Sequence, residues 1–353
     1  MRRFSNTALI MGGPVMSCMP VSSRATAAQA ADASGLSATA VHNSGYHVAS
    51  NILDTCMETF GAALSEAAGR LTAAEVFCGH GYESIHDEAV ALVLGAAGLP
   101  PEQTRAILSE PFPVEASARL MQLLQGCCES RLPVAYLLGE AWLAGICFKC
   151  DARALVPRSP IAQVVVDGCQ PWWATSVPPR TVVDLCCGGG SLGIIASQVF
   201  TAATVLLSDI DPQALSLAQE NVQRCAAERG IQCLQGHLLA SLAARSIDLI
   251  LANPPYVSAA EMAYLPAENR HEPRVALEAD EEGVALAVEL LRDAARVLSD
   301  SGLLLLEVGE SVEALEKHLP RVPFTWIDLP EGGAGVAAVS AQELRDWIAT
   351  GAL

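Results

Sequence analysis

Helical periodicity is the first clear pattern along the chain. Apolar side chains recur at spacings of three to five from Ile52 through Met57 onward, and residues 86–99 and 115–132 repeat the pattern. This spacing gathers apolar side chains on one face of a helix. We therefore predict a helical domain over residues 48–132. Its expected function is substrate recognition, and packing alone is the alternative.

The period changes after residue 132. The stretch "AYLLGEAWLAGICFKCDARALVPRSP", residues 135–160, predicts a short β-hairpin. It ends at Pro157 and Pro160, where a new helix can begin. We assign residues 133–158 to this hairpin linker and residues 159–353 to the domain that follows.

From about residue 180 the chain alternates strands with helices. The alternation predicts an α/β fold with a parallel, doubly wound, Rossmann-like sheet. Asp211 is expected to cap the helix after the second strand, with Pro212 at its first position and Gly230 at its end. Residues 324–330 and 335–340 are expected to form a terminal hairpin. The predicted strands are 181–185, 204–209, 231–236, 246–252 and 302–309, and the predicted helices are 191–200, 211–230 and 283–299.

Length and composition allow a large core and argue against a membrane span. The 353 residues suffice for two domains of about 100 to 200 residues each. The mean hydropathy is +0.33, yet no run of about 18 apolar residues is free of polar or glycine breaks. Residues 1–47 carry no acid before Asp32. Their composition is typical of an organellar targeting segment or of a disordered tail. A third alternative is that the start codon has been placed too early, so that these residues are not part of the protein.

The balance of acidic and basic residues indicates which kind of macromolecule the protein binds. With 21 basic and 39 acidic residues the formal charge is −18, and the isoelectric point is near 4.7. Stable nucleic-acid binding rests on clustered Lys and Arg, so the balance argues against it. The negative electrostatic potential of such a protein favours a basic protein as its partner. The alternative is that the charge serves solubility alone.

Twelve cysteines are scattered along the chain. Cytosolic, reduced thiols are the default for such usage, so we expect a cytoplasmic protein. The single CxxC, Cys147 and Cys150, lies in a predicted strand and lacks a second pair at zinc-binding spacing. We therefore expect no metal site.

A glycine-rich loop follows the first strand of the sheet. "DLCCGGGSLG", residues 184–193, spaces Gly188, Gly190 and Gly193 as G-x-G-x-x-G, a pattern typical of dinucleotide sites. Asp209 ends the next strand about twenty residues later, where a carboxylate can bind ribose hydroxyls. The sequence therefore predicts nucleoside binding and leaves the kind of nucleoside open.

The tetrapeptide Asn253-Pro254-Pro255-Tyr256 follows the fourth strand. Its two prolines stiffen the exit from the sheet. The Asn253 side-chain oxygen and the Pro254 carbonyl could each accept one N–H of an amide, holding its nitrogen towards a sulfonium methyl. Tyr256 could pack on the planar group. A stiff turn without function is the alternative.

Together these segments resemble the class I, S-adenosylmethionine-dependent methyltransferases, and among them the HemK-like protein glutamine methyltransferases. "DLCCGGGSLG" and "LANPPYV" carry the general resemblance. "YLPAENRHEPRVALEADEEGVALA", residues 264–287, and "VPFTWIDLPEGGAGV", residues 322–336, resemble the branch that methylates a glutamine of large-subunit ribosomal protein L-three. The likeness covers about residues 70–350.

The resemblance implies roles for single residues. It implies that Asn253, Pro254, Pro255 and Tyr256 hold the glutamine, with Asn253 also near the cofactor. Arg158 and the segment His271, Glu272 and Pro273 match group-specific stretches and are expected to shape the substrate side, or only a turn. The residues implied to bind S-adenosylmethionine are Asp184, Gly188, Gly190, Asp209, His237 and Leu238.

One position departs from the family pattern. His237 stands where an acidic residue usually precedes an apolar one, here Leu238, near the adenine. The adenine amino group therefore loses an acceptor or uses a neutral imidazole instead. We expect this to affect affinity for the cofactor rather than the chemical step.

The expected activity is methyl transfer from S-adenosylmethionine to a glutamine of a basic ribosomal protein, met free or nascent, without metal or covalent intermediate. Methylation of peptide release factors is the nearest alternative, because that branch shares the tetrapeptide. Amino methylation of adenine in DNA is a third enzymatic reading, which the charge opposes. A catalytically silent cofactor-binding assembly factor is the non-enzymatic alternative. The sequence leaves the oligomeric state open.

Overall fold

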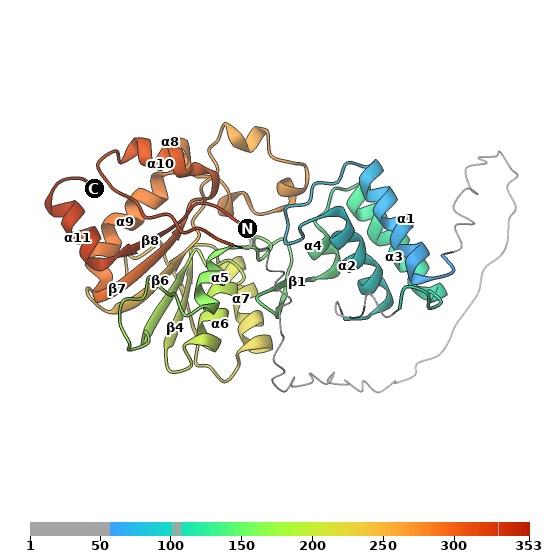
Figure 1. Cartoon of the computed structure of the whole chain (residues 1–353), viewed down its shortest axis with the longest axis horizontal. Coiled ribbons are helices and arrows are strands. Elements are labelled where there is room, and N and C mark those ends of the chain that lie inside the picture. Colours follow the sequence, from blue (N-terminus) through green and yellow to red (C-terminus); the bar gives the residue numbers. More distant parts are fainter. Residues whose placement is uncertain (1–56, 101–102, 104–106, 331) are drawn as a thin grey trace, which may run out of the picture. The chain divides into compact units, whose positions relative to one another are not determined.

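The structure, a computed structural model, describes residues 57–100, 103, 107–330 and 332–353. The predicted extension, residues 1–47, lies outside these. The described residues contain a bundle of helices, a two-stranded hairpin and a six-stranded sheet (Figure 1).

The helical bundle consists of α1 (Phe60–Ala73), α2 (Ile85–Ala97) and α3 (Val114–Cys128), with the short α4 (Val134–Leu138) after it. Local chemistry sets the helix starts, because the side chains of Thr59 and Ser84 accept backbone N–H groups at the first turns of α1 and α2. The apolar faces meet in a common core that includes Phe60, Leu92 and Leu120. Helices α1 to α3 therefore fall within the range predicted to be helical, of which residues 48–56 lie outside the described residues.

The hairpin forms where the period changed. Strand β1 (Glu140–Leu143) pairs antiparallel with β2 (Ile146–Lys149). Buried Asn221, on the helix Pro212–Cys225, ties the hairpin to the glycine-rich loop, since its Oδ1 accepts from the Lys149 N–H at 2.7 Å and its Nδ2 donates to the Gly189 carbonyl at 2.9 Å. The hairpin is thereby attached to the glycine-rich loop itself.

The large sheet has the order β5-β4-β3-β6-β7-β8. All neighbours are parallel except β7 and β8, which are antiparallel. This confirms the predicted Rossmann-like α/β fold. The strands are β3 (Thr181–Leu185), β4 (Thr204–Asp209), β5 (Gln232–Gln235), β6 (Ile247–Ala252), β7 (Leu298–Glu307) and β8 (Val336–Ser340).

Helices cover both faces of this sheet (Figure 1). Residues of α5, α6 and α7 share one apolar core with one face, and residues of α9, α10 and α11 share another core with the opposite face. The helices are α5 (Ile161–Val166), α6 (Ser191–Val199), α7 (Pro212–Cys225), α8 (Asp280–Gly283), α9 (Ala285–Val297), α10 (Val312–His318) and α11 (Ala341–Ala349). Short 3-10 turns are η2 (Glu261–Ala263), η3 (Glu268–His271), η4 (Arg274–Ala276) and η5 (Gly309–Ser311).

Two local predictions need correction. Helix α7 is capped by Asp211 and begins with Pro212 as expected, but it ends at Cys225 rather than at Gly230. Ala226 leaves helical geometry, with φ at −150°, and packs into the core.

The predicted terminal hairpin is also incomplete. Residues 324–330 form no strand and meet β8 only through a single bridge, between Trp326 and Ala337. Pro323 and Pro330 bracket the segment and cannot donate to a ladder. Strand β8 pairs instead with β7.

Candidate functional site

The site lies at the carboxyl edge of the parallel strands. Strands β3, β4, β5 and β6 are parallel neighbours, so the residues that follow them meet at one edge of the sheet. This edge lines a cavity of about 1050 Å³. Of the site residues named from the sequence, Gly190, Pro254, His271 and Glu272 do not line the cavity. Those that do are Asp184, Gly188, Asp209, His237, Leu238, Asn253, Pro255, Tyr256, Arg158 and Pro273.

The loop after β3 is held by carboxylates. Asp209 at the end of β4 accepts from the Gly188 N–H through Oδ2 and from the Asp211 N–H through Oδ1, both at 2.9 Å. Burial raises the pKa of Asp209, against these hydrogen bonds. Its carboxylate therefore links two neighbouring loops at the cavity wall, and each oxygen keeps capacity for a further donor.

Asp184 and Gly190 support this loop from beneath. The fully buried Asp184 accepts from the Gly193 N–H at 2.8 Å, and burial raises its pKa to about 7. Gly190 caps α6 with φ at +80°, and a Cβ there would come within 2.8 Å of Leu207. Gly190 thus permits the sharp turn and close helix–sheet contact.

The loop after β5 carries the position that departs from the family pattern. His237 is half exposed, and its Nδ1 lies 3.3 Å from Glu289 Oε1 on α9. Leu238 is buried with φ at +41°. Both residues line the cavity, and the Glu289 carboxylate of α9 lies beside the imidazole.

The tetrapeptide follows β6 and leaves its first side chain free. Within the described residues, neither the Asn253 side chain nor the Pro254 carbonyl has a hydrogen-bond partner. The exit of the tetrapeptide is anchored, because Ser311 Oγ donates to the Tyr256 carbonyl at 2.7 Å and the Val257 N–H donates to the Leu277 carbonyl at 2.8 Å. Asn253 lines the cavity, so its side-chain oxygen is open to a ligand there; Pro254, whose carbonyl is also unpaired, is buried and does not line the cavity.

A carboxyl group that the sequence reasoning missed lies beside Tyr256. Glu307 ends β7, is buried, and accepts from Ser159 Oγ at 2.5 Å. Burial raises its pKa to about 7, while Ser159, Arg158 and the Tyr256 phenol oppose that rise. Burial likewise raises the pKa of Tyr256 to about 12. An acid ending an apolar parallel strand was the available signal.

Replacing Glu307 with glutamine should change how stability depends on pH. Its folded pKa of about 7 exceeds the ordinary 4.5, so the protonated carboxyl favours folding; this contribution is complete below about pH 4.5 and is lost as pH rises through about 7. We expect the free energy of unfolding to fall by roughly 2–3 kcal/mol from this group between about pH 5 and 8. Urea denaturation of wild type and Glu307→Gln at both pH values measures it.

The difference between the two proteins isolates Glu307, because Asp184, whose burial also raises its pKa to about 7, contributes to both. Parallel curves for wild type and variant would contradict the assignment.

Gly309 makes room for Tyr256. A Cβ at Gly309 would lie 2.5 Å from Tyr256 Cε2, and its φ of +49° disfavours any side chain. We expect Gly309→Ala to displace the ring and lower turnover by about tenfold or more. Affinity for the cofactor should stay unchanged, because the clash is with the tetrapeptide. Steady-state kinetics and calorimetric titration measure the two effects.

Gly145→Ala is the matched control for Gly309→Ala. Gly145 also has positive φ, at +75°, but a Cβ there would meet nothing within 4 Å. The control therefore carries the backbone strain without the clash. Similar losses of turnover in both variants would mean that strain, not the displaced ring, is responsible.

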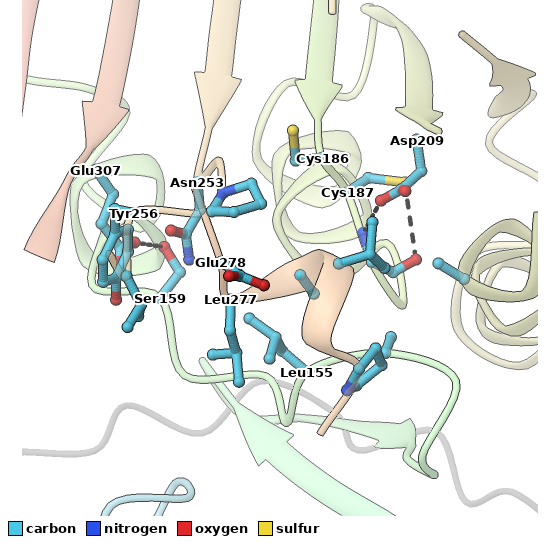
Figure 2. A pocket seen from close by; sticks show the side chains of 18 of the residues that line it. Leu155, Ser159, Cys186, Cys187, Asp209, Asn253, Tyr256, Leu277, Glu278 and Glu307 are labelled. Atoms are coloured by element: carbon cyan, nitrogen blue, oxygen red, sulfur yellow. Dashed lines mark hydrogen bonds between the residues drawn. The ribbon is translucent and has the colours of Figure 1, made fainter. Parts of the chain in front are cut away.

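Figure 2 shows how the two sides of the cavity are arranged. Glu307, Tyr256 and Ser159 gather on one side, Asp209 lies on the other, and Asn253 lies between them in this view. Exposed apolar side chains also line the cavity: Phe77, Tyr264 and Val275 are 43%, 88% and 52% exposed. The cavity is thus lined both by polar groups such as Asp209 and Asn253 and by exposed apolar side chains.

Every arginine that lines the cavity is already paired. Arg153 contacts Asp151 and Glu220, both at 2.7 Å; Arg158 contacts Glu272; and Arg274 contacts Glu278. Among the described residues, the cavity lining therefore offers no unpaired arginine or lysine to a phosphate backbone.

The described part of the chain holds no group of three or more His, Cys, Asp or Glu side chains placed to bind a metal ion. None of its helices is both long and apolar enough to cross a membrane.

Comparisons with known proteins agree with the fold and identify a methyltransferase: the model of the family described as methyltransferase small domain matches residues 174–269. A ribosomal protein uL3 glutamine methyltransferase of Xanthomonas campestris pv. campestris is 41% identical over 275 residues, covering 78% of this chain and 89% of that protein. One of Bordetella pertussis is 36% identical over 289 residues, covering 82% and 97%. The chain belongs to the family of ribosomal protein uL3 glutamine methyltransferases.

Proposed function

We propose that this protein transfers a methyl group from S-adenosylmethionine to the side-chain amide nitrogen of a glutamine in ribosomal protein uL3. The observation that carries the proposal is the Asn253 side chain, which has no hydrogen-bond partner among the described residues and lines the cavity on a segment anchored through the Tyr256 carbonyl. The named activity of the relatives supports the choice of substrate.

The residues present fit the proposed cofactor. Asp209 offers carboxylate oxygens to ribose hydroxyls, and the turn at Gly188 exposes backbone to the ligand. Leu238 offers an apolar contact to the adenine, and His237 a ring nitrogen. Asp184 would support the glycine-rich loop by accepting the hydrogen bond from the Gly193 N–H. When bound, S-adenosylmethionine supplies a methyl group made electrophilic by its sulfonium.

The chain's own groups then act on the amide. Its nitrogen is a poor nucleophile because its lone pair is delocalised into the carbonyl. Asn253 Oδ1 and the Pro254 carbonyl accept the two N–H groups, which orients the nitrogen and favours the positive charge that develops there. S-adenosylmethionine would supply the methyl group and leave as the neutral thioether, and the methylated nitrogen would lose one proton. Pro255 keeps the segment stiff, and Tyr256 packs on the planar amide.

Incubation of the purified protein with S-adenosylmethionine and free uL3, followed by peptide mass spectrometry, tests the proposal. We expect one methyl group on a glutamine side chain. A peptide release factor serves as the competing substrate. Methylation of the release factor but not of uL3 would overturn the substrate assignment, and cofactor binding without any transfer would favour a silent assembly factor.

The substrate is met free or nascent rather than assembled, and the reaction takes place in the cytoplasm, where that protein is synthesised. The charge of −18 favours encounter with a basic protein whose surface is not yet covered by RNA. Pairing of the cavity arginines also leaves little attraction for RNA. Equal rates on free uL3 and on assembled subunits would contradict this part of the proposal.

A further inference from the structure

One carboxylate outside the tetrapeptide is surrounded by donors from distant parts of the chain. The side chain of Glu272 is fully buried. Its two oxygens accept from Arg158 Nη1 at 2.5 Å and Nη2 at 2.8 Å, so the pair is bidentate. The Val156 N–H donates to it at 3.1 Å and Asn269 Nδ2 at 3.2 Å. Arg158 and Asn269 line the cavity.

The helical bundle reaches the same carboxylate. His80 is buried, and its Nε2 lies 3.4 Å from Glu272 Oε2. His80 ends residues 77–80, which we call the bundle loop. Two members of the bundle loop, Phe77 and Gly79, line the cavity. Glu272 therefore contacts both Arg158, which lines the cavity, and His80 of the bundle loop, whose Phe77 and Gly79 also line it.

A second carboxylate, four residues earlier, holds the start of the bundle loop. Glu268 Oε1 accepts from the Phe77 N–H at 3.1 Å and lies 2.6 Å from Arg131 Nη2. Arg131 in turn donates to the carbonyls of Ala74 and Glu75. The turn η3 and its C-cap thus present two buried carboxylates to the bundle.

The electrostatics indicate that Glu272 stays ionised. Burial alone would raise its pKa, but the neighbouring His80 and Arg158 lower it to about 2. Removing one partner of a buried pair is costly, because it leaves the other charge uncompensated. At neutral pH Glu272 is therefore ionised and paired with Arg158.

We propose that Glu272 is a positioning residue for methyl transfer: it holds Arg158 and the bundle loop together, so that the helical bundle forms a permanent wall of the protein-substrate site. The expected effect on the KM for uL3 rests on the proposed function. It assigns the bundle a direct share in the cavity, through Phe77 and Gly79. The cofactor end, at Asp209 and Gly188, lies on other elements and should not depend on Glu272.

Glu272→Gln tests the inference. Glutamine keeps an acceptor for the Val156 N–H but cannot accept both guanidinium bonds. We expect KM for free uL3 to rise by about tenfold or more, with the Kd for S-adenosylmethionine unchanged. Hydrogen exchange of the backbone amides at 77–80 should become faster, a readout that needs no substrate.

Two further variants complete the test. Arg158→Met/Glu272→Gln leaves no unpaired cation, and it replaces the single variant if that one does not fold. Glu66→Gln is the matched control, since it removes a carboxylate from an exposed pair with Arg70 in the same bundle. The control should keep the KM and the exchange rates of the wild type.

A folded Glu272→Gln protein with wild-type KM and wild-type exchange at 77–80 would overturn the inference. So would a parallel loss of affinity for S-adenosylmethionine, because it would mean general disorder of the site. If the wild type methylates no glutamine of uL3, the proposed function fails. Exchange at 77–80 then decides by itself whether Glu272 holds the bundle loop.

Discussion

Asn253→Ala should abolish most methyl transfer while leaving the cofactor bound. Alanine removes the side-chain oxygen that accepts one amide N–H, and the remaining acceptor, the Pro254 carbonyl, cannot orient the nitrogen alone. Loss of one preorganised group at a reacting centre costs about 10²- to 10³-fold in kcat, and we expect a fall of that size. Asp209 and Gly188 remain in place, so the Kd for S-adenosylmethionine should be unchanged.

The Asn253→Asp variant separates acceptor chemistry from shape. It keeps oxygen acceptors on a side chain of the same size, and we expect kcat between those of wild type and Asn253→Ala. Single-turnover transfer to free uL3 isolates the chemical step, and calorimetric titration gives the cofactor affinity. Turnover of Asn253→Ala close to that of wild type would refute the proposed hold on the amide.

The parts of the fold that follow from local pattern could be read from the sequence. Buried strands alternating with amphipathic helices predict a parallel sheet wherever they occur, and the six-stranded sheet confirms it. Asp211 followed by Pro212 predicts a helix start, and α7 begins there. The predicted end of α7 at Gly230 was wrong, because Ala226 leaves helical geometry and packs into the core. Packing between distant residues, rather than the glycine, sets where this helix ends.

The walls of the site required the structure, because they come from contacts between distant residues. Glu307 meets Ser159 across 148 positions in the sequence, and Glu272 meets the Val156 N–H across 116. Neither periodicity nor spacing encodes such pairs. Asp209 was identifiable because it ends β4, and the tetrapeptide because it directly follows β6; the carboxyl ends of both strands belong to the site.

Asp209→Ala should weaken cofactor binding more than any other single change at the nucleoside end. The carboxylate is proposed to accept from ribose hydroxyls, and hydrogen bonds to a charged group contribute about 1.5–3 kcal/mol each. It also accepts from the N–H groups of Gly188 and Asp211, so alanine leaves two donors unpaired and loosens the loop. We expect the Kd for S-adenosylmethionine to rise by about 10- to 100-fold.

Asp211→Ala is the matched control for this change. It removes a neighbouring carboxylate that caps α7 by accepting from the Gln213 N–H at 2.8 Å. A lost cap should lower the free energy of unfolding by about 1 kcal/mol and leave the cofactor affinity largely intact. Calorimetric titration and urea denaturation of both variants distinguish the two roles. Equal losses of affinity would mean that loop stability, not contact with the ribose, explains the effect of Asp209.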